Sequence, residues 1–312
     1  MTATQIPISA TVHTFAELRC RAQQLGPKRV AVVVADDEIA LTAASLALQT
    51  GIAKPVLIGD TRKIRSMAEG LGLSELCAGA EFVHADAGAA NVAARLARDG
   101  KADILLKGHL RTDELLHAVL DKENGLRTGH LLSDVLLYED VLAGERRLVG
   151  LSDGGLNVAP NLEQKKQIVE NAIEVMRCLG IVRPKMAIMS ASEVVSESLP
   201  STVDARALTE MGAAGVFGDA DVYGPLALDN ALLESAARAK GINSPVAGHA
   251  DCLIAPNIEA GNMFGKSVKY LGGSQCGHVV VGARVPILIP SRVESADDKL
   301  NAIAMGVLFA SR

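Results

Sequence analysis

The sequence of 312 residues contains no tryptophan, and aromatic residues make up only 3% of it. Proteins that bind single-stranded nucleic acid use aromatic side chains as stacking platforms, so this scarcity argues against such a role. No run of lysine and arginine occurs, and the net charge is -5 with a pI near 5.8. Nucleic-acid binding needs a cationic surface. We therefore expect small-molecule substrates and no nucleic-acid partner.

Cysteine pairs and long apolar runs are also lacking. The five cysteines lie far apart with no C-x-x-C pair, which argues against a zinc module. No apolar run approaches the length of a membrane span, and the first residues lack a basic segment followed by an apolar one. The sequence therefore predicts a cytoplasmic protein with reduced thiols, no metal and no membrane partner.

Two common nucleotide-binding motifs are missing as well. The first apolar run continues as VVADDE rather than as G-x-G-x-x-G, and G-x-x-x-x-G-K-[ST] does not occur. Nicotinamide-dependent and nucleoside-triphosphate-dependent enzymes are therefore less favoured.

What the sequence does contain is a series of short apolar runs with helical spacing between most of them. Hydrophobic residues make up 49% of the chain, which is enough to bury a large core. The predicted strands are residues 30–34, 54–60, 81–85, 102–108, 185–191, 215–219, 251–257 and 285–291. This alternation predicts an α/β protein with mostly parallel sheets and flanking helices.

No linker rich in proline, serine or glycine divides the chain. We expect the chain to pass between two domains near HLLSDVLLYED and near VVVGARVPI. The first α/β domain is then predicted to comprise residues 1–134 plus 285–312, and the second residues 135–284. The active site is expected in the cleft between them.

The segment PSRVESADD follows the last predicted strand and precedes the closing helix. Ligands of open α/β folds bind at the carboxyl ends of strands. Ser291, Arg292 and the amides of the helix N-terminus can therefore converge on one anion, such as phosphate. Alternatively, Ser291 or Ser295 caps the helix, and Arg292 pairs with Glu294 or Asp297.

A second strand end carries Lys107 and His109 in the sequence ADILLKGH. Both side chains can bind phosphate or remain in solvent. The residues alone favour solvent.

Long stretches of the chain resemble one enzyme family. ADCLIAPNIEAGNMFGKSVKYLGG and VGARVPILIPSRVESADDKLNAIAM are similar to the C-terminal signature of the phosphate acetyl/butyryltransferases. SDGGLNVAPNLEQKKQIVENA and GLRTGHLLSDVLLYE resemble that family too, and in particular its phosphate butyryltransferase-like branch. The resemblance covers most of the chain from Val30 onward.

This resemblance implies an acyltransferase with a two-domain fold like that of the isocitrate and isopropylmalate dehydrogenases. Such enzymes reversibly transfer a short-chain acyl group, from acetyl to butyryl, between coenzyme A and phosphate, and are usually homodimers. The implied substrates are acyl-CoA, phosphate and acyl phosphate, with coenzyme A as a substrate and no bound cofactor.

The resemblance also assigns the catalytic residues. Ser291 and Arg292 match the family's Ser-Arg pair, which binds phosphate and stabilises the transition state. Asp298 matches the base of the acetyltransferase branch, and its neighbour Asp297 matches an acidic position of the butyryltransferase branch. The choice of base is therefore left open between the two aspartates.

A second family motif, Ser-Thr-Ala-Asp-Thr-Val-Arg-Pro, falls on residues 111–118, where His117 replaces the arginine. The second phosphate-binding guanidinium is then missing unless Arg111 or Arg127 supplies it, and Arg111, His117 and Arg127 are all implied as substrate-binding positions. Further substrate-binding positions are implied by matching loops: Asn157, Pro160, Ser192, Glu259, Asn262 and Lys266.

Three other functions are considered. A metal-dependent decarboxylating dehydrogenase of the same architecture needs spaced aspartates for magnesium, and no such motif is recognisable. An acyl carrier protein:phosphate acyltransferase needs a basic surface for its carrier. A catalytically inactive regulatory domain is disfavoured because Ser291, Arg292 and Asp298 are all retained.

Overall fold

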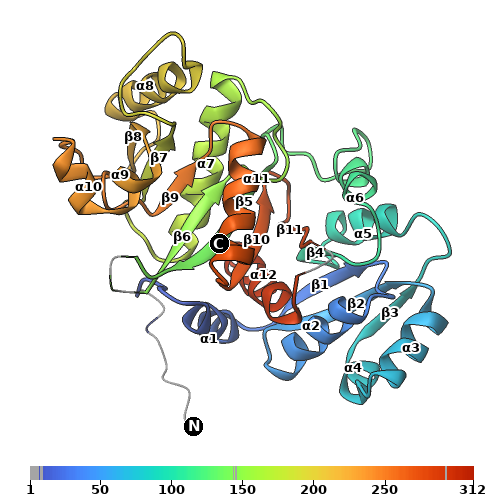
Figure 1. Ribbon diagram of the computed structural model, residues 1–312. Coiled ribbons are helices and arrows are strands. Elements are labelled where there is room, and N and C mark those ends of the chain that lie inside the picture. Colours follow the sequence, from blue (N-terminus) through green and yellow to red (C-terminus); the bar gives the residue numbers. More distant parts are fainter. Residues whose placement is uncertain (1–6, 8–9, 143, 145, 292–293) are drawn as a thin grey trace. The chain divides into compact units, whose positions relative to one another are not determined.

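The computed structural model describes residues 7, 10–142, 144, 146–291 and 294–312 (Figure 1). Arg292 lies outside these residues. The chain forms two compact units, the first built mainly from Ala16–His130 and Gly277–Arg312, and the second mainly from Leu131–Cys276. In the described part of the chain, no helix is both long enough and apolar enough to cross a membrane.

The sheet of the first unit has the strand order β3-β2-β1-β4-β11-β10. All neighbours pair parallel except β10 and β11. Every residue of β4 is buried, as is usual for a parallel strand that is covered on both faces. The strands are β1 (Lys28–Val33), β2 (Ala53–Gly59), β3 (Glu81–His84), β4 (Ile104–Lys107), β10 (Cys276–Val281) and β11 (Ile287–Leu288).

Helices cover both faces of this sheet (Figure 1). The helix after β1 and those after β2 lie on one face, and the helix after β3 lies on the other, as right-handed crossovers require. The last helix, α12, packs against α2 although the two are far apart in sequence. The helices are α1 (Phe15–Leu25), α2 (Glu38–Gln49), α3 (Thr61–Gly70), α4 (Ser74–Gly79), α5 (Ala89–Arg98), α6 (Thr112–Val119) and α12 (Ala296–Phe309).

The second unit contains the strand order β5-β6-β9-β7-β8. The pair β5–β6 is antiparallel, and the other pairs are parallel. The strands are β5 (Ser133–Asp140), β6 (Arg147–Ser152), β7 (Lys185–Met189), β8 (Asp221–Leu226) and β9 (Cys252–Ile254).

Two longer helices follow β6 and β7, and shorter ones follow β8 and β9. An apolar core forms where Leu136, Val149 and Leu253 of the strands pack with Leu232 and Phe264 of the shorter helices. The helices are α7 (Leu162–Cys178), α8 (Pro200–Ala213), α9 (Leu228–Leu232), α10 (Glu234–Ala239), α11 (Ile258–Lys266) and the π-helical turn η1 (Ser267–Leu271).

The α/β class is confirmed, and most of the described strand pairs are parallel, but the predicted isocitrate/isopropylmalate dehydrogenase-like arrangement is wrong. The pairing is mixed, with antiparallel neighbours at β5–β6 and β10–β11. Each of these pairs is joined by a short connection, residues 141–146 and 282–286. Such connections form hairpins, because a parallel crossover needs a dozen or more residues.

One predicted strand is also wrong. Residues 215–219 form turns, in which Gly215 and Gly218 adopt positive φ angles of 78° and 64°. Glycine reaches this region without steric cost, whereas an extended strand does not use it. The strand in this part of the chain is β8, which begins at Asp221.

Candidate active site

The carboxyl ends of three neighbouring strands meet at one edge of the first unit. Lys107 of β4 is level with Val33 of β1, and Leu106 is level with Leu288 of β11. Ser291 follows β11 by a few residues. Because these strands are parallel, Lys107 and Ser291 leave the sheet at the same edge, where α/β proteins bind ligands.

A cavity of about 410 Å³ lies at this edge. Lys107 is one of its walls and is only 5% exposed, so the preference for a solvated lysine is wrong. Because Ile104–Leu106 are buried in a strand that is covered on both faces, the Lys107 side chain that follows them is buried as well. The residues that line the cavity are Lys107, Leu110, Arg111, Thr112, Asp113, Ile289, Pro290 and Ser291.

The three residues predicted to bind phosphate from residues 111–127, Arg111, His117 and Arg127, differ in their placement. Arg111 lines the cavity, but its side chain is 77% exposed and bonds Asp113 at 2.9 Å. This hydrogen bond raises the pKa of Arg111 and lowers that of Asp113. His117 is exposed in the last turn of α6, and Arg127 is exposed in a bridge to Ala283; neither lines the cavity.

The start of α12 is held by a reciprocal cap. The Ser295 hydroxyl accepts the Asp298 amide at 3.2 Å, and Asp298 Oδ2 accepts the hydroxyl and the amide of Ser295 at 2.6 and 3.1 Å. The alternative in which Ser295 caps the helix is thus confirmed. Asp298 is 1% exposed, whereas the Asp297 side chain is 66% exposed and pairs with Arg19 at 3.0 Å.

A carboxylate near the end of β1 is already neutralised. Asp37 caps α2 through the Ala40 amide, and its Oδ1 lies 3.0 Å from Lys299 Nζ. Burial raises the pKa of Asp37, but the hydrogen bonds from the Ala40 amide and Lys299 together lower it by more, so the net shift of the pKa is downward. The half-buried negative charge of Asp37 is therefore balanced by the buried ammonium of Lys299.

The second unit has its own cavity of about 660 Å³ at the carboxyl ends of β6, β9 and β7. Pro160, one of the positions predicted to bind substrate, belongs to its wall. The other lining residues are Leu151, Ala159, Lys165, Met189, Ser190, Ala191, Leu199, Pro200, Ser201, Asp204, Leu228, Leu253, Ala255, Pro256, Asn257, Ala260 and Phe264.

The loop after β6 is organised by one buried carboxylate. Asp153 accepts hydrogen bonds from the amides of Asp134, Gly155 and Leu156 at 3.1, 2.7 and 2.8 Å. Asn157 donates to Asp153 Oδ2 at 2.6 Å and to the Leu132 carbonyl at 2.9 Å. Asp153 thereby fixes the orientation of Asn157.

This loop also packs directly against α11. Asn262 donates to the Gly154 carbonyl at 3.0 Å. A Cβ atom on Gly154 would lie 2.9 Å from the Gly261 backbone, and one on Gly261 would lie 2.6 Å from the Asp153 carbonyl oxygen. Glycine at both positions permits this close approach, which places the predicted residues Asn157 and Asn262 on adjoining segments.

Asp153→Asn is expected to lower the free energy of unfolding by about 1 to 3 kcal/mol, because an amide NH₂ replaces an acceptor that serves two donors. Burial and then the neighbouring Asp134 charge raise the pKa of Asp153 above 3.8. A raised folded-state pKa stabilises the folded wild type fully below the unfolded-state pKa of the group. This stabilisation is lost as the pH rises through the folded-state pKa. The difference between the proteins should therefore shrink with rising pH.

Urea unfolding of both proteins at several pH values above about 4 measures this difference. Asp229→Asn, at an exposed position in α9, is the control and should change stability little. An Asp153→Asn defect that grows with pH would contradict the interpretation.

Three further predicted residues lie outside both cavities. The Ser192 hydroxyl accepts the Val194 amide at 3.1 Å in a surface turn. Glu259 is exposed in the first turn of α11, and Lys266 Nζ lies 5.8 Å from the centre of the Tyr270 ring. Among residues with described placement, no group of three or more His, Cys, Asp or Glu side chains could hold a metal ion.

The sequence reasoning missed Asp153 and the ion pair between Lys165 and Asp204, which are 2.7 Å apart. The signal for Asp153 is its place directly after the apolar strand β6. Lys165 gives no comparable signal, because a lysine in the first turn of a helix usually faces solvent.

Each unit therefore has a ligand-sized cavity at the carboxyl ends of parallel strands, the arrangement of an α/β enzyme. Residues 80–307 match the family model described as phosphate acetyl/butaryl transferase. The chain belongs to this family and is an acyltransferase.

Curated relatives support the assignment over nearly the whole chain. The phosphate acetyltransferase of Rhizobium meliloti is 40% identical over 88% of this chain and 87% of its own length. The phosphate butyryltransferase of Clostridium beijerinckii is 38% identical over 96% of this chain and 98% of its own length.

Solved structures show the same fold. A branched-chain phosphotransacylase from Enterococcus faecalis V583 aligns with a TM-score of 0.80 and 29% identity, over 91% of this chain and 99% of that one. A phosphotransacetylase from Streptococcus pyogenes aligns with a TM-score of 0.80 and 21% identity, over 95% and 99%. The fold is thus that of the phosphotransacylases, which replaces the predicted isocitrate/isopropylmalate dehydrogenase-like fold.

Proposed function

We propose that this enzyme reversibly transfers a short-chain acyl group between coenzyme A and phosphate. The observation that carries the proposal is the first-unit cavity, in which buried Lys107 and half-buried Ser291 lie at the carboxyl ends of β4 and β11. A buried ammonium and a hydroxyl suit a phosphate group, and the family relationship supplies the acyl donor and acceptor.

In the proposed reaction, the coenzyme A thiolate attacks the carbonyl carbon of the acyl phosphate. A carbon–sulfur bond forms. The bond between the carbonyl carbon and the oxygen that bridges it to phosphorus breaks, and the electron pair of this bond leaves with phosphate. The thiol proton has passed to a base or to water beforehand. Negative charge gathers on the carbonyl oxygen and the leaving phosphate, so fixed cations and donors lower the barrier.

Lys107, Ser291 and Arg292 are the proposed phosphate-binding groups, with Arg292 assigned by resemblance. Arg111 can join them only by sharing its guanidinium with Asp113. An unperturbed aspartate is a poor base for a thiol, because their ordinary pKa values differ by more than about 4 units. We therefore propose that Asp298 mainly positions the loop that carries Ser291, through its cap with Ser295.

The purified enzyme is expected to release free thiol from acetyl-, propionyl- or butyryl-CoA only when phosphate is present. A thiol reagent measures the rate, with and without a chelator. Sulfate in place of phosphate is the control. If activity is lost in chelator and restored by magnesium, the proposal that lysine and arginine side chains alone stabilise the negative charge is contradicted.

We also propose a homodimer. Three large apolar side chains, Met263, Tyr270 and Leu271, are exposed on α11 and η1, and Leu271 is 86% exposed. Such groups favour a protein contact. Light scattering should give twice the chain mass of 32.5 kDa, and Leu271→Glu should shift the mass towards that of a single chain.

A further inference from the structure

One valine at the carboxyl edge of the first-unit sheet has a strained backbone. Val34 follows β1 directly and adopts a φ of 55°, and among the described residues other than glycine it alone has a positive φ. For a side chain branched at Cβ, this left-handed conformation is a genuine outlier. Such strain persists only where the surrounding structure enforces it, and it is concentrated at functional sites. The neighbours of Val34 must therefore hold it in this conformation.

The turn at Val34 directs a second carbonyl group towards β4. In a regular parallel sheet, successive carbonyl groups of a strand point to opposite neighbours. Here the carbonyls of Val33 and Val34 accept the amides of Gly108 and His109, at 2.9 and 2.8 Å, and both amides belong to the segment that follows β4. The left-handed φ of Val34 rotates its peptide group so that the second of these hydrogen bonds can form.

The absence of a side chain at Gly108 makes room for this turn. A Cβ atom on Gly108 would overlap the Val34 carbonyl oxygen and would lie 2.8 Å from the carbonyl oxygen of Val33. On the opposite side, the Ala35 amide donates to the Ile58 carbonyl of β2 at 3.0 Å. The turn is therefore fixed between β2 and the segment that follows β4.

The segment that Val34 holds is continuous with the wall of the phosphate cavity. Lys107 precedes it, Leu110 and Arg111 follow it, and all three line the cavity. We infer that Val34 is a positioning residue for phosphate, because its left-handed turn fixes the backbone of residues 108–109 and thereby the cavity wall on both sides of them. This inference rests on the proposed function, which assigns phosphate to the cavity.

The test changes the φ preference of position 34 in both directions. Proline locks φ at about -65°, whereas asparagine tolerates the left-handed region. Val34→Pro should lower kcat/KM for phosphate by about a hundredfold, because a misplacement of about 1 Å can cost that much. Val34→Asn should retain most of the wild-type value. The KM for acetyl- or butyryl-CoA should change little in either variant.

Gly108→Ala tests the same contact from its other partner. The new Cβ atom must push the segment away from the Val34 carbonyl, so kcat/KM for phosphate should fall while the KM for the CoA ester stays nearly constant. Gly70→Ala is the matched control, because Gly70 ends α3 and a Cβ atom there would meet no atom within 4 Å. It should leave the phosphate kinetics unchanged. Thermal unfolding shows which variants are folded.

Each outcome decides for or against the inference. If Val34→Pro does not fold, Gly108→Ala decides. Wild-type phosphate kinetics in a folded Val34→Pro or Gly108→Ala protein would overturn the inference and leave the proposed function standing. Equal losses in Val34→Asn and Val34→Pro, or a parallel rise in KM for phosphate and for the CoA ester, would also overturn it. A wild type without phosphate-dependent thiol release would overturn the proposed function and the inference together.

Discussion

Lys107→Met is expected to lower kcat/KM for phosphate by about a hundredfold or more. The substitution keeps the length of a side chain that is 5% exposed and removes its charge from the cavity that also contains Ser291. Deleting one fixed donor to a developing anion typically costs about 10²- to 10³-fold. The loss should appear with every acyl group, because phosphate is common to all of them.

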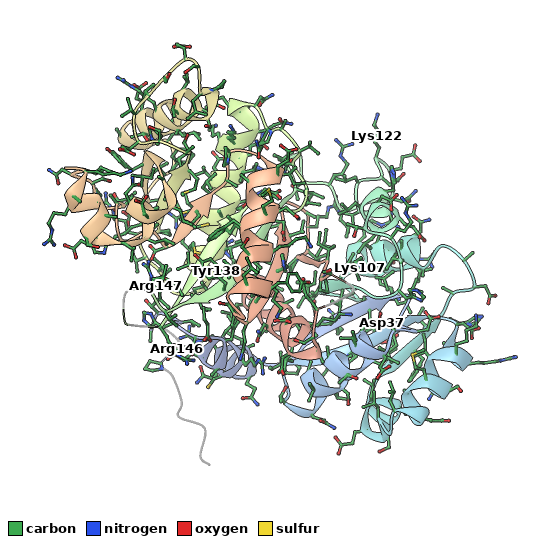
Figure 2. All side chains as sticks on the ribbon, in the orientation of Figure 1. Asp37, Lys107, Lys122, Tyr138, Arg146 and Arg147 are labelled. Atoms are coloured by element: carbon green, nitrogen blue, oxygen red, sulfur yellow. The ribbon has the colours of Figure 1, made fainter. Side chains whose placement is uncertain are left out.

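Lys122→Met is the matched control. Figure 2 shows Lys122 projecting away from the body of its unit, whereas Lys107 lies among other side chains at the end of β4. Lys107→Arg should recover part of the lost activity, because it restores the positive charge. Equal phosphate kinetics in Lys107→Met and Lys122→Met would contradict the assignment. Thermal unfolding of the two variants separates a binding defect from a folding defect.

Asp298→Asn is expected to destabilise the protein by about 2 kcal/mol. Its Oδ2 accepts two hydrogen bonds from Ser295 in a buried place, and bonds to a charged acceptor are worth about 1.5 to 3 kcal/mol each. An amide nitrogen turned towards Ser295 would oppose both donors. For a chain of 312 residues, with an unfolding entropy of about 2.1 cal/mol/K per residue, the melting temperature should fall by about 3 °C.

The same variant tests the role of Asp298 in catalysis. A base that takes the thiol proton becomes dispensable as the pH approaches the ordinary thiol pKa of about 8.5. A positioning residue does not. We expect the loss of turnover in Asp298→Asn to stay constant between about pH 6.5 and pH 9, because its exposed surface is 1% and one oxygen is engaged by Ser295.

Asp297→Asn is the control, since Asp297 is exposed and its pair with Arg19 lies at the surface. It should cost less than about 1 kcal/mol of stability. A loss of turnover in Asp297→Asn that shrinks towards high pH, with normal stability, would assign the base to Asp297.

The buried strands of the first unit were predictable because apolar runs mark them directly. Val30–Val33 and Ile104–Leu106 show the continuous pattern of strands covered on both faces. The strand β5 escaped prediction because SDVLLYED was interpreted as a crossing between domains, and the strand β6, RLVGLS, was not assigned. GVFGD was predicted as a strand, because the pattern of apolar residues does not show that two of its glycines adopt positive φ.

Site residues that directly follow a strand end could be predicted from the sequence. Residues whose role depends on how deeply the fold buries them could not. Ser291 was found from its place after VPILIP. Lys107 has the same kind of place, but its burial depends on β1 and β11, which are distant in sequence. The cap between Ser295 and Asp298 was predictable only for Ser295, because a serine before an acidic first turn is a local signal.

The division of the chain also sets an order for folding during synthesis. The second unit is nearly continuous in sequence, whereas the first needs residues on both sides of it. The strand β11, the segment with Ser291 and the buried helix α12 emerge from the ribosome long after Lys107. Chains are made at roughly 5 to 20 residues per second, so the second unit has time to fold while β4 still lacks its neighbour β11. A chain that stops before residue 285 should therefore contain a folded second unit and no phosphate pocket.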